Sequence, residues 1–330
     1  MNPTSFTLTA AVSALVALAS VTHAQSDYEP PRTPEGRPDF QGTWTNASIT
    51  TLQRHPRYDS LVLTPGEVRE ATREHPQNVR QATDDNLQSG ELLDGSDLEM
   101  GRGYNAFWID PGTSFGLVKG EYRTSWITDP EDGRIPWSSQ GEQQRQEFRE
   151  NWRGNDGPEG RSLGERCLIG FGGTGGPPML NVLYNNNYRF VQTPDYLMIL
   201  VEMNHDARII PIDGDRRPEA WQPWLGDSVA HWEGDTLVVE TRNVHPQQGQ
   251  SNQVALSEEG RVIERFTRYS AEQILYEFTV EDPVYYEQPW HGEMTFNTTE
   301  ERIYEYACHE GNYGLPGILG GARREEADAQ

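Results

Sequence analysis

The chain has 330 residues and is strongly acidic, with 51 Asp and Glu against 27 Lys and Arg and a formal net charge of −24. Such a charge repels nucleic acid and anionic membrane surfaces, so neither is an expected partner. Beyond the first 24 residues no stretch is apolar enough to cross a membrane, and no membrane insertion is expected. The length suffices for one large domain or two small ones.

Residues 1–24 have the pattern of an export signal. An apolar run from Leu8 to Val21 ends in Thr22-His23-Ala24, which places small residues at the minus-three and minus-one positions of a cleavage site. The run is too short to span a bilayer. The sequence therefore predicts a periplasmic or secreted protein that begins near Gln25.

The N-terminal part after this segment predicts few regular elements. Residues 25–38 are polar and Pro-rich, as in an extended lead-in. Gly42-Thr43-Trp44-Thr45 predicts a first strand, and Pro65-Gly66-Glu67-Val68 predicts a helix start inside a polar excursion that lasts to residue 103. A charged segment at 140–152 predicts a further helix.

Residues 104–318 predict the core of the fold, and residues 319–330 a polar tail. Aromatic-rich strand signals begin at 104–128. Further strand signals follow at 188–193, 196–201, 208–212, 231–232, 236–241, 261–269, 273–280, 294–296 and 302–307. Gly, Pro, Asp and Asn connect them at hairpin spacings, and long helices are missing. The prediction is an all-β fold, an antiparallel barrel or sandwich with an elaborated N-terminal half and few short helices.

A glycine-rich stretch interrupts this pattern at Gly172–Gly176. It lacks the Lys and Ser/Thr of a phosphate-binding loop and leads into no convincing helix. We therefore predict a flexible connection there.

The chain resembles two groups of proteins. Segments 184–194, 202–214, 231–241 and 304–314, together with 123–136, resemble a large group of exported proteins from soil and marine bacteria that has no agreed activity. Gly42-Thr43-Trp44 also resembles the Gly-x-Trp opening of lipocalin-like barrels, although the long insertion after Trp44 is unlike a small lipocalin. The second resemblance implies a cup-shaped cavity for a small apolar molecule and leaves binding and catalysis equally open.

The two cysteines, Cys167 and Cys308, predict a disulfide in an oxidising compartment. Closing such a long loop would stabilise the fold by roughly 4–5 kcal/mol in the chain-entropy model. A reactive thiol is the alternative. Two cysteines alone do not make an all-thiolate zinc site.

Glu202, His205, Asp206 and Arg208 lie between two strand signals and form one candidate catalytic set. His205 would titrate near neutral pH, Glu202 would orient it, and Arg208 would stabilise a developing anion. The alternative is a polar turn in which Arg208 pairs locally with Asp213.

His309 and Glu310 form a second candidate pair, because a disulfide at Cys308 would hold them in place. They equally fit a structural C-terminal segment in which His309 caps a carbonyl. No metal or other cofactor is expected: the spacing Glu202-x-x-His205 belongs to helical di-iron sites, whereas this segment lies between strands. A metal site assembled from His205, His291 and His309 would have no spacing signature.

A group of aromatic and amide side chains predicts an organic-ligand pocket, because such side chains combine an apolar face with a polar tip. Its members are Tyr104, Asn105, Trp108, Tyr184, Asn187, Tyr188, Trp290 and His291. Core filling is the alternative role for each aromatic residue.

The sequence lacks the Gly-x-Ser-x-Gly of α/β-hydrolases and the βαβ pattern of nucleotide-dependent oxidoreductases. We therefore expect an exported, cofactor-independent lyase or isomerase that acts on a small organic molecule, of which aromatic and terpenoid compounds are examples. The alternatives are a periplasmic binding protein for a similar ligand and a metal-dependent hydrolase. The oligomeric state is not predicted.

Overall fold

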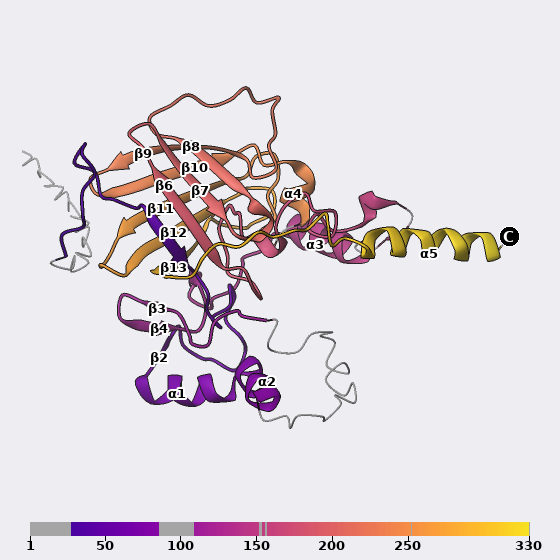
Figure 1. Cartoon of the computed structure of the whole chain (residues 1–330), viewed down its shortest axis with the longest axis horizontal. Helices are drawn as coiled ribbons and strands as arrows, with labels where there is room; N and C mark the ends of the chain where they lie inside the picture. Colours follow the sequence, from indigo (N-terminus) through magenta and orange to yellow (C-terminus); the bar gives the residue numbers. More distant parts are fainter. Residues whose placement is uncertain (1–27, 86–108, 152–153, 156, 252, 330) are drawn as a thin grey trace, which may run out of the picture.

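The computed structural model describes residues 28–85, 109–151, 154–155, 157–251 and 253–329 (Figure 1). The expected export signal and the predicted residues Tyr104, Asn105 and Trp108 lie outside these ranges. No helix in the described ranges is long and apolar enough to cross a membrane.

Nine antiparallel strands form a nearly closed barrel in the order β8-β7-β6-β1-β13-β12-β11-β10-β9, so the predicted all-β barrel is confirmed. The strands are β1 (Gly42–Thr45), β6 (Asn187–Gln192), β7 (Tyr196–Val201), β8 (Ala207–Pro211), β9 (Asp227–Glu233), β10 (Thr236–Arg242), β11 (Arg261–Arg268), β12 (Gln273–Glu281) and β13 (Trp290–Thr298). A parallel bridge between Ile212, just after β8, and Ala230 of β9 joins the two outermost strands of this order. This closure protects the edges of the sheet.

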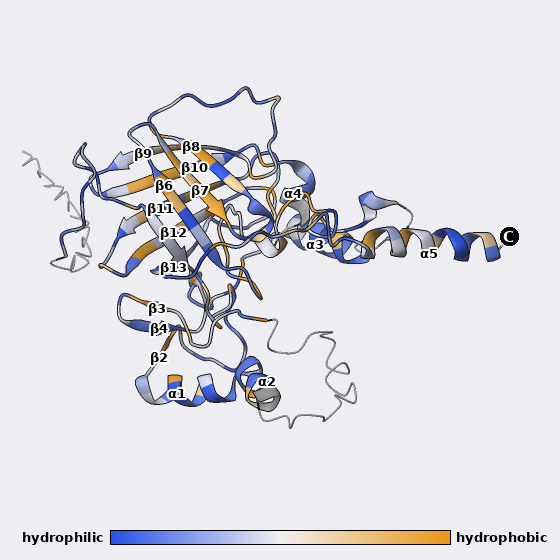
Figure 2. Cartoon of the chain, viewed as in Figure 1, coloured by the Kyte–Doolittle hydropathy of each residue, from blue (hydrophilic) through white to orange (hydrophobic). Residues whose placement is uncertain are grey.

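Alternation of apolar and polar residues places one face of each strand in the barrel (Figure 2). In β12 the inward residues are Ile274, Tyr276, Phe278 and Val280. Aromatic rings fill the interior: the centroids of Tyr276 and Phe266 lie 5.0 Å apart. The barrel therefore has a packed aromatic core.

The glycine-rich stretch, predicted as a flexible connection, is instead buried in the barrel from Gly173 onward, whereas Gly172 is exposed. Residues Gly173–Leu180, which we call the plug, are all buried. The Met179 N–H donates to Tyr276 Oη at 2.9 Å, and Tyr188 Oη donates to the Thr174 carbonyl at 3.1 Å. The prediction was wrong because glycines supply tight backbone turns inside a core as well as mobility: Gly173 has a φ of 87°.

A smaller N-terminal lobe lies beside the barrel (Figure 1). It consists of β2 (Val62–Leu63), α1 (Pro65–Glu74), α2 (Pro76–Asp85), β3 (Leu117–Val118) and β4 (Glu121–Arg123). The helix predicted at Pro65 is present and begins with a capping box between Thr64 and Glu67. Ile49, Leu63, Val68 and Phe115 form a second small core there.

Polar contacts and a short strand attach this lobe to the outer face of the barrel. Arg123 and Lys119 both pair with Glu293 of β13, at 2.5 and 2.7 Å. Strand β5 (Ile127–Asp129) adds to β13 itself. The described part of the strand signals at 104–128 is thus divided between β3 and β4 of the lobe and β5, which pairs with β13.

The C-terminal segment differs from the prediction. Residues 302–307 form no strand, because β13 already pairs with β12, β1 and β5. Residues 304–313, which we call the strap, run outside the barrel into α5 (Gly314–Asp328), which projects from the body (Figure 1). The expected polar tail is the end of this helix. The other helices within the described ranges are α3 (Ser139–Asn151), close to the predicted 140–152, α4 (Pro246–Ser251), and the short 3-10 turns η3 (Pro158–Gly160), η4 (Phe171–Gly173) and η5 (Met203–His205).

Candidate functional site

The predicted acid Glu202 does not orient His205. Glu202 is buried where β7 ends, and its carboxylate accepts hydrogen bonds from Asn187 Nδ2 at 3.0 Å and from the Tyr304 N–H at 3.3 Å. Its partners therefore belong to β6 and to the strap. Asn187, which was predicted to bind a ligand, donates one of these hydrogen bonds to Glu202.

His205 also binds the strap. Its ring Nε2 accepts the Tyr306 N–H at 2.9 Å, so this nitrogen carries no proton in the contact. His205 and the preceding Asn204 have positive φ values of 54° and 57°, and the side chain of His205 is exposed. The His205 turn and the C-terminal segment thus meet in space, through a hydrogen bond from the backbone of the strap to the His205 ring.

Asp206 adds a third segment to this junction. Its Oδ2 accepts the Gly170 N–H at 2.6 Å, just before the plug. Burial raises the pKa of the Asp206 carboxyl, an effect that the hydrogen bond from Gly170 partly offsets. The junction of β7, the strap and the plug entrance is therefore held by side chains that bind main-chain N–H groups.

The predicted disulfide between Cys167 and Cys308 is confirmed, with Cα atoms 5.8 Å apart. Asn312 Nδ2 donates to the Glu165 carbonyl at 2.7 Å in the same region. His309 and Glu310 follow Cys308 in an exposed turn of the strap. Neither of them lines either of the two larger pockets described below.

Arg208 lies apart from His205, because the alternation of β8 turns it into the barrel with Ile210. Its guanidinium forms a bidentate ion pair with Glu264 and donates to Thr241 Oγ1 at 3.2 Å. Tyr276 Oη donates to Glu264 Oε1 at 2.6 Å. The expected alternative of a local pair with Asp213 is wrong, since the chain positions Arg208 toward β11 across the interior. We call Arg208, Glu264 and Tyr276 with Ser228 and Thr241 the inner cluster.

The predicted pocket residues do not line one pocket in the described structure. Tyr188 and Trp290 are fully buried in the barrel core, where Trp290 packs edge-on against Phe278 and Tyr286. Tyr184 is half-buried against the same core. His291 is on the outer face, with its Nδ1 2.7 Å from Thr279 Oγ1.

A largely apolar pocket of about 460 Å³ lies outside the barrel, between the plug and the N-terminal lobe. We call it the apolar pocket. It is lined by Ser48, Ile49, Thr50, Thr51, Leu52, His75, Gln77, Pro111, Trp126, Phe171, Gly172, Leu180, Asn181, Val182, Leu183 and Gln253. Its volume lies within the range of roughly 300–1,000 Å³ that is usual for small-molecule sites.

Asn181 fixes the walls of this pocket. Its Nδ2 donates to the carbonyls of Ser48 and Thr50 at 2.7 and 3.2 Å, and its Oδ1 accepts Trp126 Nε1 at 2.7 Å. Gly172 has a φ of 64°, and a Cβ there would lie 2.6 Å from Val182. The hydrogen bonds of Asn181 and the close approach of Gly172 to Val182 therefore hold the walls of the pocket in place before any ligand enters.

Gln77 supplies a polar group that has no partner. Its side chain is 5% exposed, Nε2 donates to the Ile109 carbonyl at 3.1 Å, and Oε1 is buried without a hydrogen bond. A buried acceptor that stays unsatisfied costs about 1–3 kcal/mol. The pocket thus combines apolar walls with a lining residue, Gln77, whose buried Oε1 has no hydrogen-bond partner.

The sequence did not predict this pocket, because its walls come from segments that carry no motif. Only the buried plug and the fold of the lobe bring Gln77, Trp126 and Phe171 together. Within the described residues, no group of three or more His, Cys, Asp or Glu side chains is placed to hold a metal ion.

The chain matches no protein-family model, no curated protein and no solved structure.

Proposed function

We propose that the protein is an exported binding protein for a small, mostly apolar organic molecule that carries a hydrogen-bond donor. The unpartnered, buried Oε1 of Gln77, a residue that lines the apolar pocket, is the observation that supports this most directly. A ligand hydroxyl or amine would satisfy that oxygen, while its body would contact Phe171, Trp126 and Leu180.

The arrangement of the titratable groups favours binding over the expected lyase or isomerase. Glu202 and His205 bind backbone N–H groups of the strap, and Arg208 is paired inside the barrel. None of the three lines the apolar pocket. Acid and base groups must reach the bond that reacts, and this set is placed for structural contacts.

The experiment is a fluorescence titration with N-phenylnaphthylamine, a neutral probe that has an apolar body and one N–H donor. We expect saturable binding at one site. Phe171→Ala removes an apolar wall and should weaken binding about tenfold, and Gln77→Leu should weaken it by a similar factor, since it removes the acceptor.

A matched pair of apolar surface residues provides the control. Leu183 lines the pocket and is 49% exposed, whereas Ile209 is 57% exposed on the outer face of β8. Leu183→Ala should weaken binding, and Ile209→Ala should leave it unchanged. Equal affinities for wild type and all pocket variants would refute the proposed site.

Catalysis is a second candidate because one titratable side chain, His75, does line the apolar pocket. A lyase or isomerase there would use His75 for proton transfer. Incubating the protein with a pool of aromatic and terpenoid compounds, followed by mass spectrometry, separates the two candidates. Conversion beyond the molar amount of protein, abolished by His75→Gln, would establish turnover, whereas stoichiometric retention supports binding.

A further inference from the structure

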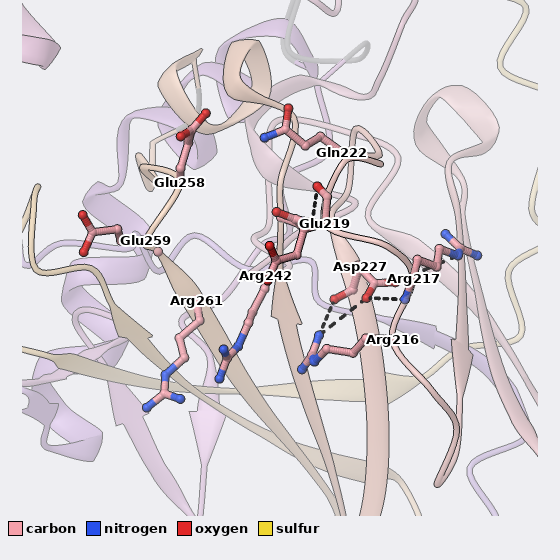
Figure 3. Close-up of a pocket in the computed structure, with 11 residues that line it drawn as sticks. Arg216, Arg217, Glu219, Gln222, Asp227, Arg242, Glu258, Glu259 and Arg261 are labelled. Carbon is pink, nitrogen blue, oxygen red and sulfur yellow. Dashed lines mark hydrogen bonds and ion pairs between the residues drawn. The ribbon is translucent and has the colours of Figure 1, made fainter.

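A second pocket, different in chemistry from the first, lies on the outer side of the barrel near the ends of β9, β10 and β11. It has a volume of about 730 Å³ and is lined almost wholly by charged and amide side chains. We call it the arginine cleft (Figure 3). Its residues are Arg216, Arg217, Glu219, Gln222, Asp227, Arg242, Asn243, Glu258, Glu259, Gly260 and Arg261.

Each of the four guanidinium groups of the cleft has a carboxylate at 3.9 Å or less. Arg242 pairs with Glu240 at 2.8 Å and Arg261 with Glu281 at 2.5 Å. Arg216 pairs with Glu240 and lies 3.7 Å from Asp227, which is also 3.9 Å from Arg217. The arginines therefore offer fixed hydrogen-bond donors rather than a positive potential.

Carboxylates on the other side of the cleft add negative charge. Glu219, Glu258 and Glu259 line it, and Figure 3 shows Glu258 and Glu219 apart from the guanidinium groups of Arg242 and Arg261. With Asp227, Glu240 and Glu281 the carboxylates outnumber the guanidiniums. An anionic ligand such as a phosphate is therefore disfavoured at this site.

An exposed aromatic ring contacts one of the arginines that line the cleft. The Arg217 guanidinium stacks on Trp221 at 4.3 Å from the ring centroid, and Trp221 remains 55% exposed. Gln222, which lines the cleft, follows it directly. A ring that is held by a cation on one side and open to solvent offers a flat apolar surface beside dense polar groups.

We propose that the arginine cleft binds a neutral carbohydrate. Each sugar hydroxyl both donates and accepts, so it matches a wall in which guanidinium donors alternate with carboxylate and amide acceptors. The apolar face of a sugar ring would pack on Trp221. This site is separate from the apolar pocket, with which it shares no lining residue.

The test is binding of the whole protein to an array of neutral, acidic and amino oligosaccharides, followed by calorimetry with the neutral glycan that is retained most strongly. Trp221→Ala and Glu258→Gln should each weaken its affinity at least fivefold. Both residues are exposed and should leave folding intact. Tyr313→Ala, which removes an aromatic ring that is 83% exposed on the strap, is the control and should change nothing.

The dependence of affinity on salt concentration distinguishes a neutral ligand from a charged one. The affinity for a neutral glycan should change less than twofold between low and high ionic strength, since no net charge is neutralised. Retention of only acidic glycans, of only cationic ones, or of none overturns the proposal. Unchanged N-phenylnaphthylamine binding by Trp221→Ala would show that the result is independent of the apolar pocket.

Discussion

The inner cluster and the arginine cleft use the same chemical groups in opposite surroundings. Inside the barrel, Arg208 and Glu264 are 2% and 0% exposed, and hydroxyl groups from Ser228, Thr241 and Tyr276 add hydrogen bonds, while Arg208 Nε is buried without a partner. In the cleft, Glu240 pairs with Arg216, Arg242 and Arg261 while solvent reaches all of them. Burial makes each charge of the inner pair destabilising without the other, whereas exposure leaves the outer groups available for a ligand.

The largest difference should appear when one partner of each pair is removed. Glu264→Leu leaves the Arg208 charge buried and unpaired, and we expect a loss of about 3–5 kcal/mol in the free energy of unfolding. Denaturant titration followed by tryptophan fluorescence measures it. The double variant Arg208→Met/Glu264→Leu should recover most of the loss, because it removes both charges. A single variant as stable as wild type would contradict the role of the inner cluster.

A smaller loss should follow from Tyr276→Phe, because Tyr276 connects the inner cluster to the plug. The hydroxyl donates to Glu264 Oε1 and accepts the Met179 N–H, so its removal leaves the Met179 N–H without this partner and takes one of two hydrogen bonds from Glu264 Oε1. We expect a loss of about 2 kcal/mol. Hydrogen exchange of the Met179 amide should also speed up by more than that of amides in β10. Uniform exchange would show that the plug does not depend on this contact.

The smallest equilibrium effect is expected for Glu240→Gln, the outer counterpart of Glu264→Leu. Partly exposed ion pairs are worth at most about 1 kcal/mol each, because water screens them. The same denaturant titration therefore should show a change below that value. A loss as large as that of Glu264→Leu would erase the distinction between the two clusters.

The ion pairs of Glu240 should instead affect the stability of the protein at acidic pH. Burial raises the pKa of Glu240, but Arg242, Arg216 and Arg261 outweigh it and lower the pKa overall. A lowered pKa in the folded state gives stability above the unfolded value of about 4.3, and this stability is lost as the pH falls through the folded value. Thermal melts between about pH 6 and 3 should decline less steeply for Glu240→Gln than for wild type.

Sequence patterns were sufficient for the barrel and for the disulfide. Alternation in β11 and β12 fixes which side chains face inward, and a single pair of cysteines has one pairing. The same alternation places Arg208 with Ile210, so its burial was accessible from the sequence. Its partner Glu264 was not, because the two lie 56 positions apart in the chain.

The candidate site was harder to predict, for two physical reasons. A glycine-rich segment carries no hydrophobic pattern, so its burial as the plug depends on contacts with Tyr188 and Tyr276 that only the closed barrel provides. Gln77 lies in a polar helix, and its contact with the Ile109 carbonyl joins residues 32 positions apart in the chain. His205, in contrast, was predicted as a catalytic residue from its residue type and neighbours, whereas in the structure its ring accepts a hydrogen bond from the strap.

The most direct test of the proposed function is a crystal structure of the protein with N-phenylnaphthylamine. We predict the probe between Phe171, Leu180 and Gln77, with its N–H donating to Gln77 Oε1 and the barrel interior unchanged. Density for the probe among Tyr276, Phe296 and Trp290, with the plug displaced, would contradict the account and place the ligand site inside the barrel.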